Sequence, residues 1–158
     1  MYSIDTNALI DWWWRRYPPD VFPGVRRKME ELIAIGRLRA SEVVGDELEV
    51  GGDDLFQWAS EMRGLFVNTT DDIERRAADL VAQHPYLVDE DSTRPQADQY
   101  VIAAALECGW TVVTQETFAS TKKAGKRRGR TYIPDVCRHL NVPCINLLQL
   151  MRREHWRF

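Results

Sequence analysis

The amino-acid sequence predicts an α/β fold with three layers (α/β/α), in which a central, mostly parallel sheet of four to five strands lies between helices. Short segments of β-branched and apolar residues alternate with longer segments whose apolar residues recur at helical spacing. Glycine, proline or capping residues mark most changes between the two kinds of segment. The chain has 158 residues, of which 44% are hydrophobic and 28% charged. We therefore expect residues 1–158 to form a single domain around one core.

The first third of the chain is expected to begin with a strand and to continue as helices. Residues 2–5 alternate between polar and apolar side chains, and the apolar residues among 7–13 suit a buried helix. Prolines and a glycine between residues 18 and 24 interrupt that helix. Apolar residues at helical spacing then predict a second helix from residue 25 to Gly36.

Capping residues divide the next segment. Ser41 is expected to cap a short helix that carries Glu42 in its first turn and ends at two glycines, residues 51–52. Asp53 begins another helix, and Thr70 caps the one after it. The segment between those two helices, residues 64–68, is compatible with a strand or with the end of a helix.

The last part of the chain contains the clearest strand. Residues 84–96 are acidic and contain proline, which predicts a loop, and residues 97–108 have the apolar face of a helix. Residues 110–114 are β-branched and apolar, which strongly favours a strand. A helix up to His139, a last strand at residues 143–146 and a terminal helix complete the order. Strands that are separated by helices predict a parallel sheet, whose carboxyl ends form the functional crevice.

The charges are unevenly distributed along the chain. The formal net charge is −3, which argues against a surface that binds nucleic acid everywhere. One segment nevertheless carries six cations, two glycines and no acid, so we expect it to bind RNA phosphates; a solvated surface loop is the alternative. The six cations of this basic segment are Lys122, Lys123, Lys126, Arg127, Arg128 and Arg130.

Cysteine content and hydropathy exclude several classes of protein. The three cysteines are odd in number, are far apart and form no CxxC pair, so we expect neither disulfides nor a zinc site but reduced core residues. The longest apolar run, residues 100–106, is too short to cross a membrane. The expected location is the cytoplasm, with no membrane association.

Four carboxylates follow or begin predicted elements. Asp5 and Glu116 come after strands, Asp98 begins a helix, and Glu47 lies on the short helix that Ser41 caps. Each has an ordinary explanation when taken alone, since Asp5 and Asp98 could cap helices and Glu47 could be solvated. Their joint position at one end of a parallel sheet instead predicts a single cluster.

Such a cluster requires a counter-cation. Two carboxylates about 4 Å apart repel by roughly 4 kcal/mol at an effective dielectric constant near 20. Oxygen ligands favour Mg²⁺ or Mn²⁺, and none of the three histidines is paired at the sequence spacing of zinc ligands. The chain also lacks a convincing Ser/His/Asp set or nucleophilic cysteine.

At this point the sequence resembles the PIN-domain nucleases over nearly its whole length. It is most similar to a small prokaryotic branch related to VapC-type toxins, marked by IPDVC at residues 133–137 and by the ending WRF. The ordered motifs are IDTNALI at residues 4–10, DEL at 46–48, AD at 97–98 leading into IAAA at 102–105, and VVTQE at 112–116.

The resemblance implies a PIN-like endoribonuclease that hydrolyses RNA with a metal-activated water, as the toxin of a toxin–antitoxin pair. It implies that Asp5, Glu47, Asp98 and Glu116 are catalytic and bind Mg²⁺ or Mn²⁺, with Asn7 and Thr114 as polar support. An antitoxin and a second copy of the chain are the expected protein partners. Most PIN domains have an aspartate where this chain has Glu116, and the stretch that follows is longer here. Glu42 and Asp46 remain alternatives to Glu47.

Two other interpretations stay open. A haloacid-dehalogenase-type phosphatase also begins with a strand and an aspartate, but it needs a second aspartate where this chain has Asn7. A catalytically silent PIN fold that binds RNA or a protein is the alternative from a different class. Three consecutive tryptophans on a helix, residues 12–14, point in different directions, so at most two can face the core. We expect the other to contact a partner or a second copy of the chain, with stacking on an RNA base as the alternative.

Overall fold

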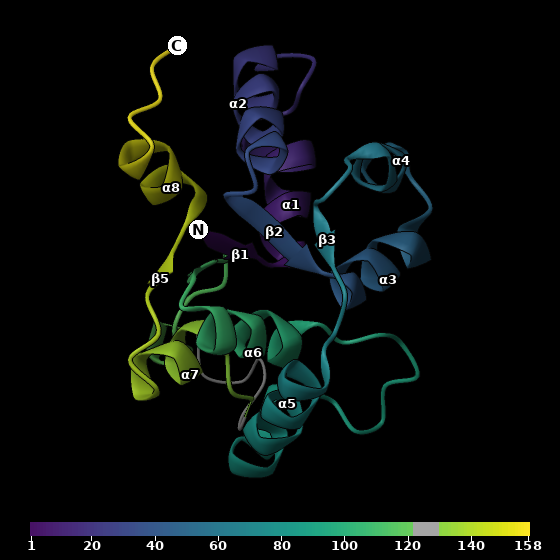
Figure 1. The fold of residues 1–158 in the computed structure, drawn as a ribbon, viewed down its shortest axis with the longest axis vertical. Coiled ribbons are helices and arrows are strands. Elements are labelled where there is room, and N and C mark those ends of the chain that lie inside the picture. The colour runs from purple at the N-terminus through teal and green to yellow at the C-terminus, as the bar shows by residue number, and fades with distance from the viewer. Residues whose placement is uncertain (122–129) are drawn as a thin grey trace.

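The computed structural model describes residues 1–121 and 130–158. Its sheet contains five parallel strands in the order β3-β2-β1-β4-β5, so the predicted α/β architecture is confirmed (Figure 1). Ser3 of β1 pairs with Arg39 of β2 on one side and with Val112 of β4 on the other. The strands are β1 (Tyr2–Ile4), β2 (Leu38–Ser41), β3 (Phe66–Val67), β4 (Thr111–Val113) and β5 (Cys144–Ile145).

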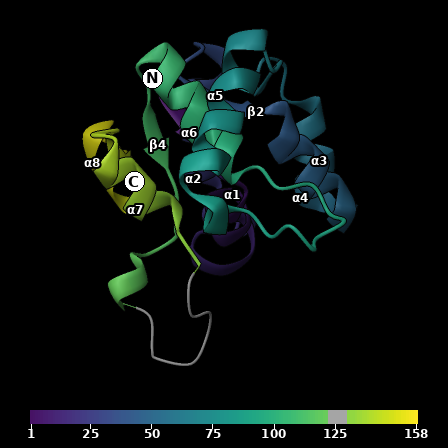
Figure 2. The ribbon, with the colours of Figure 1, turned by 90° about the horizontal axis from the view of Figure 1, so that it is seen from below.

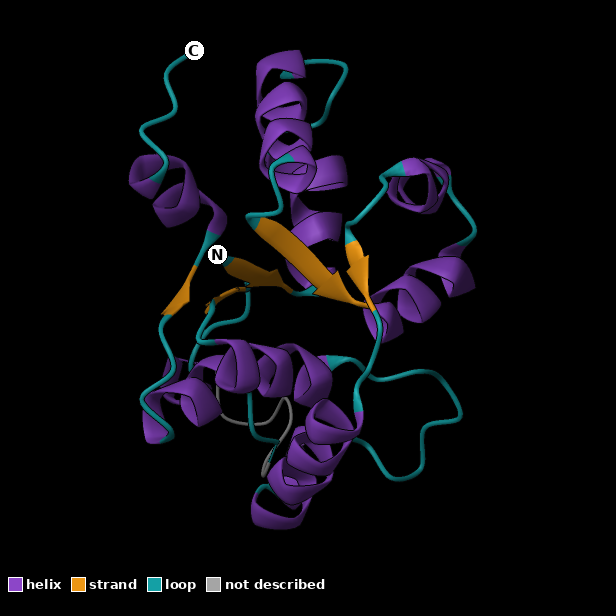
Figure 3. Ribbon diagram, viewed as in Figure 1, coloured by secondary structure: helices purple, strands orange, loops and turns teal. Residues whose placement is uncertain are grey.

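Helices cover both faces of this sheet. Helices α5, α6 and α7 lie on one face and α1, α2 and α8 on the other, while α3 and α4 lie beside β3 (Figures 1 and 3). Figure 2, seen from below, shows α5 alongside α6, against which it packs. The helices are α1 (Thr6–Ile10), α2 (Pro23–Ala34), α3 (Glu42–Gly51), α4 (Asp54–Glu61), α5 (Asp71–Gln83), α6 (Asp98–Cys108), α7 (Ile133–His139) and α8 (Leu147–Arg153).

Strand β2 is the element that the sequence does not predict. Leu38 and Ala40 are buried, but the strand is four residues long and contains Arg39. The guanidinium of Arg39 donates to the carbonyl oxygens of Ile33, at 3.2 Å, and of Gly64. This segment has little strand preference of its own, so pairing with β1 and β3 determines its conformation.

Local capping interactions agree with the predicted helix starts. Ser41 accepts a hydrogen bond from the Val43 backbone N–H at 3.3 Å, and Thr70 accepts one from Ile73 at 3.3 Å. Three short helical turns also occur in the part of the chain that the structure describes. One follows α1 directly, and another lies within the predicted loop at residues 84–96. These are η1 (Asp11–Arg16), which is a π-helical turn, η2 (Pro85–Leu87) and η3 (Ala119–Thr121).

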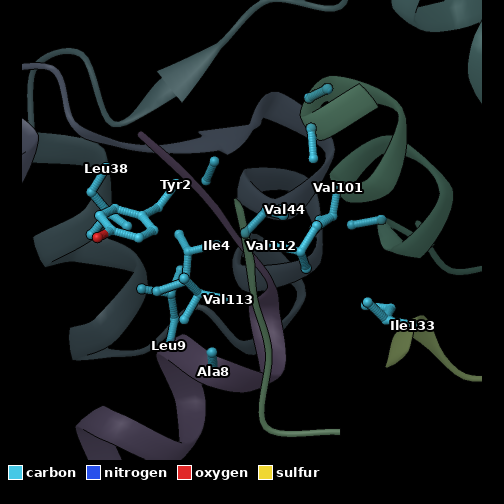
Figure 4. Close-up of a cluster of buried hydrophobic side chains, with 14 of the residues drawn as sticks. Tyr2, Ile4, Ala8, Leu9, Leu38, Val44, Val101, Val112, Val113 and Ile133 are labelled. Atoms are coloured by element: carbon cyan, nitrogen blue, oxygen red, sulfur yellow. The ribbon is translucent and has the colours of Figure 1, made fainter. Parts of the chain in front are cut away.

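The core lies between the central strands and the helices on both faces. Ile4 of β1 and Val113 of β4 are fully buried beside Leu9 of α1, and Val112 lies near Val101 of α6 (Figure 4). Burying one such side chain contributes roughly 1.5–3 kcal/mol relative to exposure. This packing determines where β1 and β4 end, and therefore where the polar residues that follow them lie.

The three tryptophans divide as predicted. Trp12 and Trp13 are buried, whereas 49% of Trp14 is exposed. Trp12 packs against Trp58 of α4 with ring centroids 4.9 Å apart. The expectation of three core cysteines is wrong for one of them, because Cys108 at the end of α6 is exposed. Within residues 1–121 and 130–158, no helix is both long and apolar enough to span a membrane.

Candidate metal centre

The four predicted carboxylates meet at the carboxyl ends of β1 and β4. The chain passes from β1 to β2 and β3 on one side, and then returns to β4 on the other side, so the strand order changes direction between β1 and β4. Open parallel sheets bind their ligands at such a point. Asp5 directly follows β1 and Glu116 follows β4, while Asp98 begins α6, which packs against both strands. Glu47 reaches the same place from α3.

Asp5 is the most buried of these acids, with 2% of its surface exposed. Its side chain does not cap α1, so the capping explanation does not apply. Instead, its Oδ2 accepts a hydrogen bond from the Thr114 hydroxyl at 2.8 Å. Burial and the negative charge of Asp98 raise the pKa of Asp5 well above its usual value, with smaller contributions from Glu116 and Glu47.

Asp98 is the first residue of α6, and the residue in the capping position is Ala97. Burial and the charges of Glu116 and Glu47 raise the pKa of Asp98 to about 7. The guanidinium of Arg130 acts in the opposite direction, with its Nη2 3.6 Å from Asp98 Oδ2. A carboxyl group that is half protonated near neutral pH indicates a site lacking enough positive charge.

Glu47 is the acid of its segment that joins the cluster. The hydroxyl of Thr6 and the backbone N–H of Ala97, at 2.9 Å, donate to its two carboxylate oxygens. Burial raises the pKa of Glu47. Glu42 instead accepts a hydrogen bond from the backbone of Thr69 at 2.5 Å, and Asp46 is exposed. Neither of these alternatives is among the charges that act on Asp5 or Asp98.

Glu116 is held by two elements at once. Its backbone N–H donates to the Thr114 hydroxyl at 3.0 Å, and its carboxylate accepts from the backbone N–H of Ile133, the first residue of α7, at 2.9 Å. The charge of Glu116 acts on Asp5, Asp98 and Glu47. The Glu116 side chain, one methylene longer than the aspartate usual at this position, thus connects the end of β4 to the start of α7.

The two predicted supporting residues differ. Thr114 lies in the cluster, where its hydroxyl bonds to both Asp5 and Glu116. For Asn7, no side-chain hydrogen bond to the cluster occurs among the described residues, and its neighbour Thr6 makes the contact with Glu47. The prediction named Asn7, whereas in the structure the hydroxyl of Thr6 makes the contact on this side of the cluster.

A second layer of polar contacts was not predicted. Gln115 donates to Asp11 at 2.7 Å and accepts from the backbone N–H of Leu147 at 3.1 Å. Asp11 is buried, and the hydrogen bonds from Gln115 and Arg16 outweigh the effect of burial and lower its pKa. Because Gln115 lies between Thr114 and Glu116, this network positions the backbone that carries both. Asp11 lies six residues after Asp5, and nothing in the sequence distinguishes it from an aspartate on the surface.

The donor set fits a hard divalent cation. Carboxylate oxygens and retained waters are the ligands that Mg²⁺ and Mn²⁺ prefer. Across residues 1–121 and 130–158, no three His, Cys, Asp or Glu side chains already close around a single position. Glu47, Glu116 and Asp98 are directed instead to a backbone N–H, a hydroxyl or a guanidinium. These three carboxylates therefore face protein donors and not one shared position.

The predicted basic segment lies almost entirely outside the described residues. Of its six cations, Arg130 alone is described, and it lies beside Asp98. The other five are Lys122, Lys123, Lys126, Arg127 and Arg128.

We expect Thr114→Val to destabilise the protein by about 1–3 kcal/mol, because the buried Asp5 carboxyl loses its hydroxyl partner. Thr111→Val, three residues earlier in β4, is the matched control, since that hydroxyl accepts a hydrogen bond from the exposed Arg153 at 3.2 Å. Urea unfolding measures both. Equal free energies of unfolding for the two variants would contradict a special role for Thr114.

Comparisons with known proteins agree with this fold. A family model described as a domain of unknown function (DUF4411) matches residues 2–158. The chain is also similar to one chain of the crystal structure of VapBC2 from Rickettsia felis bound to a DNA fragment from their promoter. The TM-score is 0.50 and the identity 13%, over 92% of this chain and 97% of that one. No curated protein matches the sequence. At this identity the likeness concerns the fold alone, and it confirms the predicted PIN-like fold.

Proposed function

The chain belongs to the family described as a domain of unknown function (DUF4411), and from its PIN-like fold and its site we propose that it is a metal-dependent endoribonuclease. One observation carries this proposal. Four carboxylates, one after β1, one on α3, one at the start of α6 and one after β4, share a site where burial and their mutual repulsion raise the pKa of three of them. Natural proteins retain such unfavourable clusters mainly where they perform chemistry.

A divalent cation at this cluster accounts for its charge. Asp5, Glu47, Asp98 and Glu116 would be its ligands. Bound Mg²⁺ or Mn²⁺ would supply a water of lowered pKa and positive charge for the scissile phosphate. The protein would contribute orientation, because Thr114 holds Asp5 and the backbone N–H of Ile133 holds Glu116.

RNA is the proposed substrate, and the basic segment would bind the RNA phosphates. Five of the six cations of this segment lie between residues 122 and 129, and the sixth, Arg130, is next to the carboxylates. A segment rich in cations that adjoins Arg130 in the sequence suits a polyanionic substrate.

The biological role that we propose for this ribonuclease is that of the toxin in a toxin–antitoxin pair. It is supported by the likeness of the fold to a chain of a VapBC2 complex. The exposed Trp14 would then contribute to the surface that contacts an antitoxin or a second copy of the chain. Co-purification with a protein encoded next to this chain is the corresponding measurement.

The second candidate is a catalytically silent PIN fold that binds RNA or protein. The basic segment and Trp14 suit it equally well, but it gives no reason for a cluster of four acids of which Asp5 is buried and the other three are partly buried. Titration with Mn²⁺ separates the two candidates. A silent module should bind no Mn²⁺ that is lost on acid-to-amide substitution.

Metal dependence tests the proposed function directly. We expect purified protein to cleave labelled single-stranded RNA in Mn²⁺, to lose that activity on EDTA treatment and to regain it when Mn²⁺ is restored in excess. Gel analysis of the products with time is the measurement. Cleavage that persists unchanged in EDTA would show that the carboxylates do not act through a cation.

A further inference from the structure

Arg130 is a cation inside the carboxylate cluster. Its Nη2 lies 3.6 Å from Asp98 Oδ2, and 35% of its side chain is exposed. Its charge also acts on Glu47, where it opposes the rise in pKa that burial causes. Arg130 therefore neutralises part of the same negative charge that we assign to a divalent cation.

The contact between Arg130 and Asp98 is incomplete. A strong arginine–carboxylate pair is bidentate, with two parallel hydrogen bonds of about 2.7–2.9 Å. Here, one nitrogen faces one oxygen at 3.6 Å, and the buried Nε of Arg130 has no hydrogen-bond partner among the described residues. The guanidinium lies at the edge of contact with the Tyr132 ring, 6.0 Å from its centroid. Such a pair can be exchanged for a better counter-ion at little cost.

The Asp98 carboxylate cannot pair fully with Arg130 and bind a metal ion at the same time. Asp98 Oδ2 faces Arg130, and the proposed function requires Asp98 to face a metal ion. We propose that Arg130 is the counter-cation of the carboxylate cluster in the metal-free protein, and that a divalent cation must displace it from Asp98 in order to bind. This inference rests on the proposed function, because it takes Asp98 as a ligand.

An arginine in α7, outside the basic segment, serves as the control. Arg138 pairs with Asp135 at 3.5 Å and lies over the Phe118 ring at 4.6 Å, so like Arg130 it has one carboxylate and one aromatic ring as partners. Asp135 is not among the charges that act on Asp5 or Asp98. Removing this arginine changes the overall charge equally but leaves the cluster unchanged.

Calorimetric titration with Mn²⁺ at pH 8 tests the inference. We expect Arg130→Gln to bind Mn²⁺ about tenfold more tightly than the wild type, because the cation no longer competes with a positive charge at contact distance. Arg130→Lys keeps the charge and should bind within about threefold of the wild type. Arg138→Gln should bind as the wild type does. Circular dichroism checks that each variant is folded, and Arg130→Met, which retains the apolar stem beside Tyr132, replaces Arg130→Gln if the latter unfolds.

The outcomes separate this inference from the proposed function. Mn²⁺ binding by Arg130→Gln that is equal to or weaker than that of the wild type overturns the inference, while the metal site itself stands. Mn²⁺ binding that is absent from the wild type, or unchanged in Asp98→Asn, overturns the proposed function and the inference with it.

Discussion

Asp5→Asn is expected to reduce RNA cleavage on the order of a thousandfold and to weaken Mn²⁺ binding. Asparagine has the shape of aspartate but carries no charge, and one of its two terminal groups cannot act as a ligand. The Thr114 hydroxyl can still donate to the amide oxygen, so the local packing is preserved. The loss would therefore report on the chemistry of the site.

Stability provides the control for this experiment. Asp5 is buried and repelled by Asp98, Glu116 and Glu47, so its neutral replacement should leave the metal-free protein at least as stable as the wild type. Asp46→Asn is the matched surface variant, since this exposed acid adjoins Glu47 but is outside the cluster. Single-turnover cleavage rates and thermal unfolding in EDTA are the measurements. Undiminished cleavage by Asp5→Asn, or equal losses in both variants, would falsify the assignment.

The metal-free protein is expected to lose stability as the pH rises from about 4 to 7, through the contribution of Asp98. Its pKa is about 7 in the folded protein and 3.8 in the reference state. Below pH 4 the group is protonated in both states, so its contribution is fully present there and disappears as the pH passes the folded pKa. At pH 8, Asp98→Asn should be more stable than the wild type by on the order of 3 kcal/mol.

The difference between wild type and Asp98→Asn is the quantity to measure, because other groups titrate in the opposite sense. The pKa values of Asp11 and His84 are lowered, so their contributions are lost as the pH falls. Urea unfolding in EDTA at several pH values should show a difference that grows from pH 4 to pH 8. Mn²⁺ at 100 times its Kd should restore about 2.7 kcal/mol to the wild type at pH 8 and much less to the variant. A difference independent of pH would contradict the raised pKa of Asp98.

Much of the fold could be predicted because its signals are local. Ser41 and Thr70 bond to backbone N–H groups two and three residues ahead, so the helix starts can be identified from short segments. Residues 111–113 are β-branched or apolar throughout and form β4 as expected. Strand β2 was missed because its conformation depends on pairing with β1 and β3. Both strands are distant from β2 in the sequence, so the pairing exists only in the folded protein.

The identity of the fourth acid depended on the orientation of a helix. Val44 and Leu48 of α3 are buried one turn apart, and Glu47 lies next to them around the helix axis. Asp46 projects from the opposite side and is exposed. The sequence contains this periodicity, but only packing against the sheet shows that the buried side of α3 adjoins the crevice. Glu42, at the start of α3, turns to the backbone of Thr69 instead.

The sequence by itself determined that this is an α/β chain with acids at the ends of its elements, since periodicity and capping are properties of neighbouring residues. Only the tertiary structure decided which polar groups share the cluster: Thr6 in place of Asn7, Arg130 beside Asp98, and Gln115 linked to Asp11. Electrostatic effects depend on distance and burial, and both are set by segments that meet only in the folded protein. The four carboxylates Asp5, Glu47, Asp98 and Glu116 could therefore be predicted from the sequence. The positive charges and hydrogen-bond donors that surround them depend on the fold.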